Sequence, residues 1–210
     1  MPQNKPPYYP LNELIDMIPE SNGNACRVMY REYKDLFEQA LGAKHNHQAW
    51  PGGYVDHITD AMNTSLILFD VLNAARPLPF QRTDALVVLF LHDLEKPFKY
   101  HLGNDRTVFK NPEFTNRQDD TAKKQELIEK FGIKLNKQQV NALKYVEGVR
   151  DDESSPEARI MGELATLCHC ADTISALLWY NYPLDEDKDP WDGARRVNEL
   201  ANTFTVASEL

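Results

Sequence analysis

The sequence predicts an all-α fold, a single bundle of about seven or eight helices within one domain, residues 1–210. Apolar residues recur every three or four positions along 55–72 and 160–178, which is the period of an amphipathic helix. The length suits one hydrophobic core. The apolar run 85–91 fits a buried helix or a buried strand by pattern alone. We interpret it as a helix because no other segment supplies a strand to pair with it.

Proline and glycine divide the first half of the chain. Residues 1–10 hold four prolines and are expected to form an extended arm. A loop with two histidines, one proline and two glycines, residues 45–53, separates the second expected helix from the third. The helices expected here are 11–18, closed by Pro19; 24–41, stopped by Gly42; 55–72; and 84–96, capped by Thr83 and ended by Pro97.

The second half begins with an irregular stretch, residues 98–114, that includes a small hairpin around 107–109. Asn136 and Gln139 have the spacing of a capping box at a helix start. The other helices expected here are a polar one over 117–131, one beginning at Ser155-Pro156-Glu157 and continuing through the stripe 160–178, and a final one from about Trp191.

The composition excludes several classes of protein. With 42% hydrophobic and 26% charged residues, the chain is not a disordered polymer. The net charge is −9 and no cluster of lysine and arginine stands out, so we do not expect extended nucleic acid as a partner. Three cysteines are too few for a disulfide framework. No apolar leader or membrane-length run is present. We therefore expect a cytoplasmic, non-membrane protein whose oligomeric state is open.

Four side chains are candidate metal ligands: His57, His92, Asp93 and Asp172. Each lies on or at the end of an expected helix. An aspartate that ends a wholly apolar helix costs several kcal/mol unless it is paired or binds a metal. Two imidazoles and two carboxylates suit a borderline or hard divalent ion. Taken singly, each residue is as well explained by packing or by an ion pair.

The order of these residues resembles the H…HD…D signature of the HD-domain metal-dependent phosphohydrolases. The matching segments are Gly52-Gly53-Tyr54-Val55-Asp56-His57, His92-Asp93-Leu94-Glu95-Lys96 and Ala171-Asp172, with a His-x-x-x-Pro-Gly-Gly lead-in at 47–53. The resemblance covers about residues 45–180 and implies an all-α fold. It further implies one tightly bound divalent ion (Mn, Co, Fe, Ni, Zn or Mg) held by His57, His92, Asp93 and Asp172.

The resemblance also implies that Lys96 lies near a substrate phosphate and that a metal-activated water attacks phosphorus. Two features differ from the family. Glu95 stands where many relatives have glycine. The interval before Asp172 holds only His101 and His169, at a spacing unlike that of dinuclear members.

Further candidates have weaker support. Glu147 is a candidate general acid or base, or else a solvated helix charge. Trp50 is a candidate for stacking on a base, or else a packing residue. The remaining candidates are His45 and His47 beside a substrate phosphate, Arg150 and Arg159 as phosphate clamps, and Cys168 and Cys170 as packing thiols.

Three functions remain open on the sequence. The first is hydrolysis of a phosphate ester or anhydride of a nucleotide, of the nucleotidase or deoxynucleotide triphosphohydrolase type. The second is a 3′–5′ exoribonuclease-like phosphodiesterase. The third is a non-catalytic, metal-stabilised nucleotide-binding or regulatory domain. We expect a small phosphorylated substrate because the chain is acidic and lacks a basic stripe.

Overall fold

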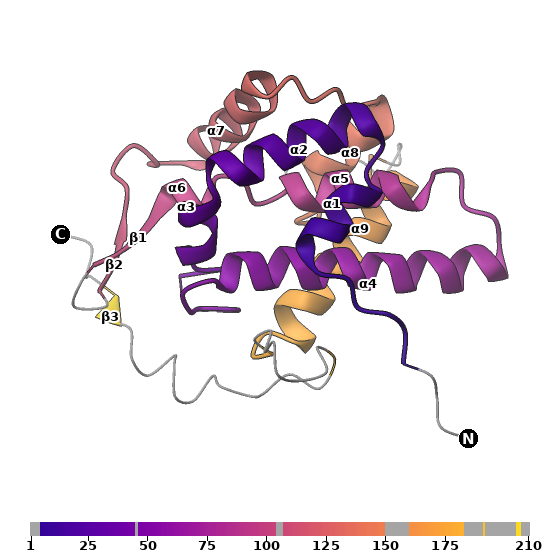
Figure 1. The fold of residues 1–210 in the computed structure, drawn as a ribbon, viewed down its shortest axis with the longest axis horizontal. Coiled ribbons are helices and arrows are strands. Elements are labelled where there is room, and N and C mark those ends of the chain that lie inside the picture. Colours follow the sequence, from indigo (N-terminus) through magenta and orange to yellow (C-terminus); the bar gives the residue numbers. More distant parts are fainter. Residues whose placement is uncertain are drawn as a thin grey trace.

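The computed structural model describes residues 5–44, 46–103, 107–149, 160–182, 191 and 205–206. These residues form nine α-helices, one π-helical turn and a small three-stranded sheet (Figure 1), so the predicted all-α bundle is confirmed. The α-helices are α1 (Leu11–Met17), α2 (Glu20–Glu32), α3 (Lys34–Gln39), α4 (Gly53–Ala75), α5 (Arg82–Leu91), α6 (Lys96–Lys99), α7 (Arg117–Lys130), α8 (Lys137–Tyr145) and α9 (Glu163–Thr173). The π-helical turn η2 (Ile174–Leu178) continues directly from α9.

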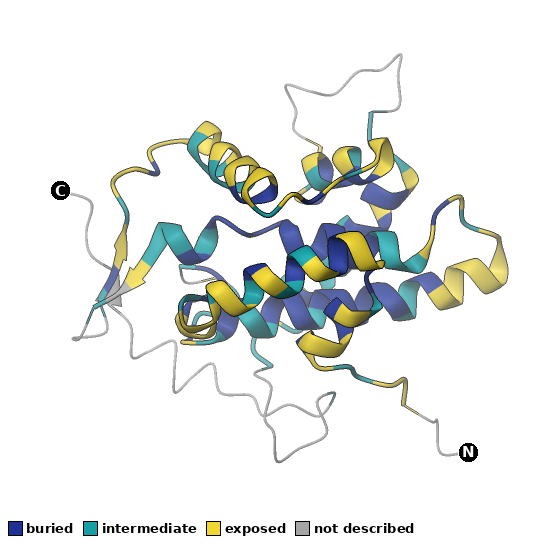
Figure 2. Ribbon diagram, turned by 45° about the horizontal axis from the view of Figure 1, so that its top comes forward, coloured by how far each residue is buried: buried dark blue, intermediate teal, exposed yellow. Residues whose placement is uncertain are grey.

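The core is built around α5. All seven residues from Ala85 to Leu91 are buried. They pack against α1, α4, α8 and α9, and the dark blue segments of Figure 2 mark this centre. Each large apolar side chain buried here contributes about 1.5–3 kcal/mol. The apolar run is therefore a buried helix, as predicted.

The long helix α4 crosses the bundle below α5 in the view of Figure 1 and packs against α5 and α9. It begins after Gly52, whose φ of +86° is a left-handed conformation that glycine adopts without steric cost. The helix is 23 residues long and extends the predicted 55–72 segment at both ends.

The expected helix 24–41 is wrong as a single element. The structure has two helices there, α2 and α3, and α2 starts directly after Pro19. Tyr33, with φ −107° and ψ 19°, separates the two helices. No glycine or proline marks this break, so the sequence pattern does not predict it.

The expected helix 84–96 differs at both ends. Gln81, not Thr83, caps α5, and its side chain forms a capping box with Asp84. The helix ends at Leu91, four turn residues follow, and Lys96 begins α6. Pro97 lies in the first turn of α6 rather than ending a helix, because proline is well tolerated where its missing N–H has no helical partner.

The hairpin is confirmed: β1 (Tyr100–Leu102) pairs antiparallel with β2 (Thr107–Lys110). A third strand that we did not predict, β3 (Thr205–Val206), pairs parallel with β2. The capping box at Asn136 is also confirmed. The start expected at 155–157 and the last helix beyond Trp191 lie outside the described residues. The helix expected through 160–178 is wrong at its start, because residues 160–162 are not helical and α9 begins at Glu163. Within the described part of the chain, no helix is long and apolar enough to cross a membrane.

Candidate metal centre

Four predicted side chains meet at one point of the bundle, although they come from three elements. His57 lies on α4, His92 and Asp93 in the turn after α5, and Asp172 on α9. The Nε2 atoms of His57 and His92 lie 3.3 Å apart. Asp93 Oδ2 is 3.4 Å from Nε2 of His57 and 3.3 Å from Nε2 of His92. Asp172 Oδ1 is 3.1 Å from the former and 3.4 Å from the latter.

These separations fit donors that share one ion. Bonds from zinc to nitrogen or oxygen are about 2.0–2.2 Å, so neighbouring donors at tetrahedral or octahedral angles lie about 3.0–3.5 Å apart. His57, His92 and Asp93 form a set of three metal-ligating side chains whose donor atoms all lie within 4.8 Å of one another. Asp172 adds a fourth donor through its contacts with both imidazoles.

Hydrogen bonds at the far side of each ring fix which nitrogen is protonated. His92 Nδ1 is 2.7 Å from the carbonyl oxygen of Leu89, which only accepts, so this nitrogen must donate. His57 Nδ1 is 3.1 Å from Ser175 Oγ. The single hydrogen of this hydroxyl faces two other acceptors, the carbonyl of His57 at 3.3 Å and the carboxyl of Asp60, so His57 Nδ1 donates. With Nδ1 donating in both rings, Nε2 of each ring is left to bind a metal ion or a proton, and the two Nε2 atoms face each other, an arrangement typical of metal-binding histidines.

The cluster is deeply buried and strongly coupled electrostatically. His57, His92 and Asp93 are at most 2% exposed, and the Asp172 side chain is 17% exposed. Burial alone would lower the pKa of His92, but Asp93 and Asp172 raise it to about 10. Burial opposes the charge on Asp93, but His92 and Lys96 hold its pKa well below the usual range. A cation or a proton is therefore needed among these carboxylates and imidazoles.

Lys96 lies at the cluster, in the one-turn helix α6 rather than in the last turn of the expected helix 84–96. It is the first residue of α6, and its Nζ forms an ion pair with Asp93 Oδ2. A helix start does not favour a cation, so the helix dipole does not account for Lys96. The ammonium group instead supplies positive charge directly beside a predicted metal ligand.

The structure adds a residue that we did not predict. Lys124 reaches from α7 to the turn after α5 and donates to the carbonyl of His92 at 2.8 Å. Its Nζ also lies 3.5 Å from the buried carboxyl of Glu95 and 4.0 Å from the exposed carboxyl of Glu147. Burial raises the pKa of Glu95 to about 7, although Lys124 lowers it. The sequence shows Lys124 only as half of a lysine pair among acidic neighbours.

His47 lies beside the cluster, with its ring centroid 4.7 Å from that of His57. Burial and the nearby His57 and Lys96 lower the pKa of His47 to about 4. Trp50 is 5% exposed and donates from Nε1 to Asp56 at 2.7 Å. A buried, hydrogen-bonded indole favours the packing interpretation over stacking on a base.

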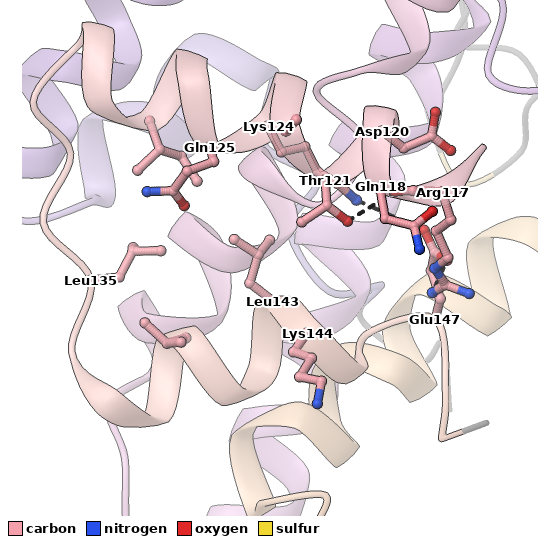
Figure 3. A pocket seen from close by; sticks show the side chains of 13 residues that line it. Arg117, Gln118, Asp120, Thr121, Lys124, Gln125, Leu135, Leu143, Lys144 and Glu147 are labelled. Carbon is pink, nitrogen blue, oxygen red and sulfur yellow. Dashed lines mark hydrogen bonds and ion pairs between the residues drawn. The ribbon is translucent and has the colours of Figure 1, made fainter. Parts of the chain in front are cut away.

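The ion pairs of Glu147 are with Arg117 and Lys124, and neither of these residues is a candidate ligand. Glu147 pairs with Arg117 at 2.7 Å and is 40% exposed. Both residues line a cavity of about 880 Å³ between α7 and α8 (Figure 3). This cavity contains none of the four candidate ligands in its lining and shares Lys124 with the turn after α5.

The remaining candidates lie apart from the centre or outside the described residues. His169 binds the carbonyl of Val146 through Nδ1 at 2.7 Å, and His101 lies exposed on β1. Cys168 is buried, as expected for a packing thiol, whereas Cys170 is exposed, contrary to that expectation. Cys170 follows Cys168 by two positions, which places the two on different sides of the helix. His45, Arg150 and Arg159 lie outside the described residues.

Comparisons with protein-family models, with curated proteins and with solved structures each returned no match.

Proposed function

We propose that this chain is a metal-dependent phosphohydrolase of the HD-domain type, acting on a phosphate ester or anhydride of a nucleotide. The observation that carries the proposal is the convergence of His57, His92, Asp93 and Asp172, within 3.1–3.4 Å of one another in the five contacts given above. The order of these residues in the chain is the order of the family's signature.

His57 and His92 would hold a divalent ion through Nε2, while Asp93 and Asp172 would hold it through carboxylate oxygens. A bound divalent ion supplies a water of lowered pKa and a Lewis acid for the phosphoryl oxygen. The chain contributes the geometry. The Leu89 carbonyl and the Ser175 hydroxyl orient the two imidazoles, and the bundle excludes bulk water from three of the four ligands.

Charge supports an anionic substrate. Two carboxylates and one divalent cation sum to zero, so the Lys96 ammonium leaves the site with one net positive charge. Lys96 is 18% exposed and Asp172 is 17% exposed, whereas the other ligands are more deeply buried. Access from solvent is therefore on the side of these two residues, and Lys96 is the residue that we assign to the substrate phosphate.

A second candidate is a metal-stabilised nucleotide-binding domain without turnover. The observation that favours it is the near-complete burial of His57, His92 and Asp93, because structural metal sites are closed whereas catalytic sites keep an open position. Partial exposure of Asp172 favours the hydrolase. The net charge of −9 favours nucleotide monomers over RNA as substrate for either candidate.

The test is a hydrolysis screen over nucleoside mono-, di- and triphosphates, cyclic nucleotides and a short RNA, with Mn²⁺, Co²⁺, Mg²⁺ or Zn²⁺ supplied in turn. We expect turnover of at least one nucleotide monomer, abolished in Asp93→Ala and retained in Asp70→Ala, whose carboxylate is exposed on α4. Metal binding without turnover of any substrate would favour the binding domain. Processive shortening of RNA with monomers untouched would overturn the assignment to nucleotide monomers.

A further inference from the structure

Gln48 connects the loop before α4 to the π-helical turn after α9. It is 1% exposed, and with φ +39° it is the one non-glycine residue of positive φ in the described part of the chain. A Cβ atom on Gly53 would overlap the carbonyl oxygen of Gln48, and one on Gly42 would lie 2.8 Å from its Cβ. Two glycines thus make room for a conformation that is costly for glutamine and that the surrounding packing maintains.

The contacts of the Gln48 side chain determine the orientation of its amide. Nε2 lies 3.0 Å from the carbonyl of Ser175 and 3.4 Å from that of Trp179. Both carbonyls only accept hydrogen bonds, so the amide nitrogen must face them. The oxygen Oε1 must then face His47, whose Nδ1 lies 2.8 Å away.

This orientation determines the tautomer of His47. An amide oxygen has no hydrogen to give, so His47 Nδ1 must donate to Gln48 Oε1. The neutral His47 ring consequently carries its lone pair on Nε2. The same arrangement holds for His57, because the Ser175 hydroxyl receives a hydrogen bond from its Nδ1.

Ser175 is common to both arms of this network. Its hydroxyl contacts His57 Nδ1, and its carbonyl accepts from Gln48, which in turn contacts His47. Ser175 is fully buried within η2. Single π-helical turns are frequent at functional sites, and here the turn directs the hydroxyl of Ser175 at His57 and its carbonyl at Gln48.

We propose that Gln48 and Ser175 are positioning residues that fix the tautomers of His47 and His57, so that His47 presents Nε2 as a hydrogen-bond acceptor beside the metal centre. The proposal rests on the proposed function for the identity of that centre. An acceptor nitrogen attracts a water or a substrate hydroxyl and repels a phosphate oxygen, since ionised phosphate oxygens only accept. His47 therefore receives a proton donor, which replaces the phosphate contact expected from the sequence.

The alternative is that Gln48 and Ser175 only brace the loop against η2. Bracing predicts a loss of stability on substitution, with no change in histidine tautomers and none in metal affinity. The two roles can be separated by substitutions matched in burial and hydrogen bonding. Asn22→Leu removes an amide that binds the main chain of Lys134. Ser65→Ala removes a buried hydroxyl of α4 that binds the carbonyl of Met62.

The experiment uses the full chain with ¹⁵N-labelled histidine. NMR of the metal-free protein reports the tautomer of each ring, and Zn²⁺ competition with a chelator reports metal affinity. We expect His47 to be protonated at Nδ1 in the metal-free wild type, and His57 and His92 to be protonated at Nδ1 alone once Zn²⁺ occupies their Nε2 atoms. Gln48→Met should shift His47 away from this tautomer and leave Zn²⁺ affinity within about threefold, because Gln48 does not touch the ligands.

Ser175→Ala should weaken Zn²⁺ binding by about 10–100-fold, the usual effect of removing a partner of a ligating histidine, and Ser175→Thr should restore it. The two control variants should change neither tautomers nor Zn²⁺ affinity. A wild-type His47 protonated at Nε2, an unchanged His47 tautomer in Gln48→Met, or wild-type affinity in Ser175→Ala would overturn the proposal. Absence of Zn²⁺ binding by the wild type would refute the proposed function instead, and the His47 tautomer of the metal-free protein would still decide this inference.

Discussion

The Asp172 carboxylate lies 3.1 Å from Nε2 of His57, so the first and the last of the candidate ligands meet where α9 packs against α4. Neither residue is near the other in sequence, and the buried turn after α5 supplies the two ligands between them. The centre therefore exists only in the folded bundle. Any substitution at these positions tests packing and ligation together, which makes matched controls necessary.

Replacing Asp172 by Asn should remove metal while preserving the bundle. The amide keeps the shape of the carboxylate but places a weaker, uncharged donor beside His57 and His92. We expect metal affinity to fall by at least about 100-fold, more than for a group that only orients a ligating side chain. Elemental analysis and Zn²⁺ titration measure it, with Asp70→Asn on α4 as the control. Metal content equal to that of the wild type would remove Asp172 from the centre.

Replacing Lys96 by Met should separate binding from turnover. In the metal-free protein the Asp93 carboxylate loses Lys96 but keeps His57 and His92, so we expect a loss of stability smaller than the roughly 3–5 kcal/mol of a buried charge left without any partner. Metal should bind as tightly as in the wild type or more tightly, because a competing cation is gone. The rate should fall by roughly 10²–10³-fold if the ammonium stabilises phosphate charge.

The matched control for Lys96 is Lys99→Met, since Lys99 lies on the same short helix and forms a 2.7 Å pair with Asp120, with a similarly buried side chain. This variant should lose stability without a comparable loss of rate. Values of kcat/KM, Zn²⁺ affinity and unfolding free energy are compared for both variants. A Lys96→Met enzyme with kcat/KM within a few-fold of the wild type would show that Lys96 serves only as the counter-charge of Asp93.

Replacing Lys124 by Met should loosen the turn that carries His92 and Asp93. The change removes the donor to the His92 carbonyl and the cation beside Glu95. A buried acceptor left unsatisfied costs about 1–3 kcal/mol, so we expect lower stability and weaker metal binding. Lys123→Met, whose ion pair with Glu126 is on the surface of the same helix, should do neither. Equal metal affinities for the two variants would confine Lys124 to a role in stability.

The sequence predicted those parts of the molecule that depend on local pattern. The apolar run at 85–91, the capping box at Asn136 and the hairpin at 107–109 were all found. The end of α5 was not, because Pro97 is compatible with the end of one helix and with the first turn of the next. Lys124, Gln48 and Ser175 were missed for a different reason. Their contacts with the centre span long stretches of chain, and no motif marks such contacts.

Asp60, one turn after His57 on α4, should give the chain a distinctive dependence of stability on pH. Burial raises the pKa of its carboxyl from 3.8 to about 6, although a hydrogen bond from Ser175 lowers it. Its Oδ2 is buried and makes no hydrogen bond. Between about pH 4 and pH 6 the folded state therefore holds a proton that the unfolded state has released. Linkage then requires the unfolding free energy to decrease as pH rises through this window.

Asp60→Asn should remove that decrease. The variant should match the wild type near pH 4 and exceed it above pH 6, by at most about 3 kcal/mol at about 1.4 kcal/mol per pH unit. Urea unfolding of the metal-free proteins at pH 4, 5, 6 and 7 measures the difference, and subtraction of the wild-type curve cancels groups common to both. Asp70→Asn, on the same helix but exposed, should show no such rise. An Asp60→Asn protein less stable than the wild type at pH 7 would mean that the Asp60 carboxylate is compensated in the fold, and that its hydrogen bond with Ser175 outweighs the cost of burying its charge.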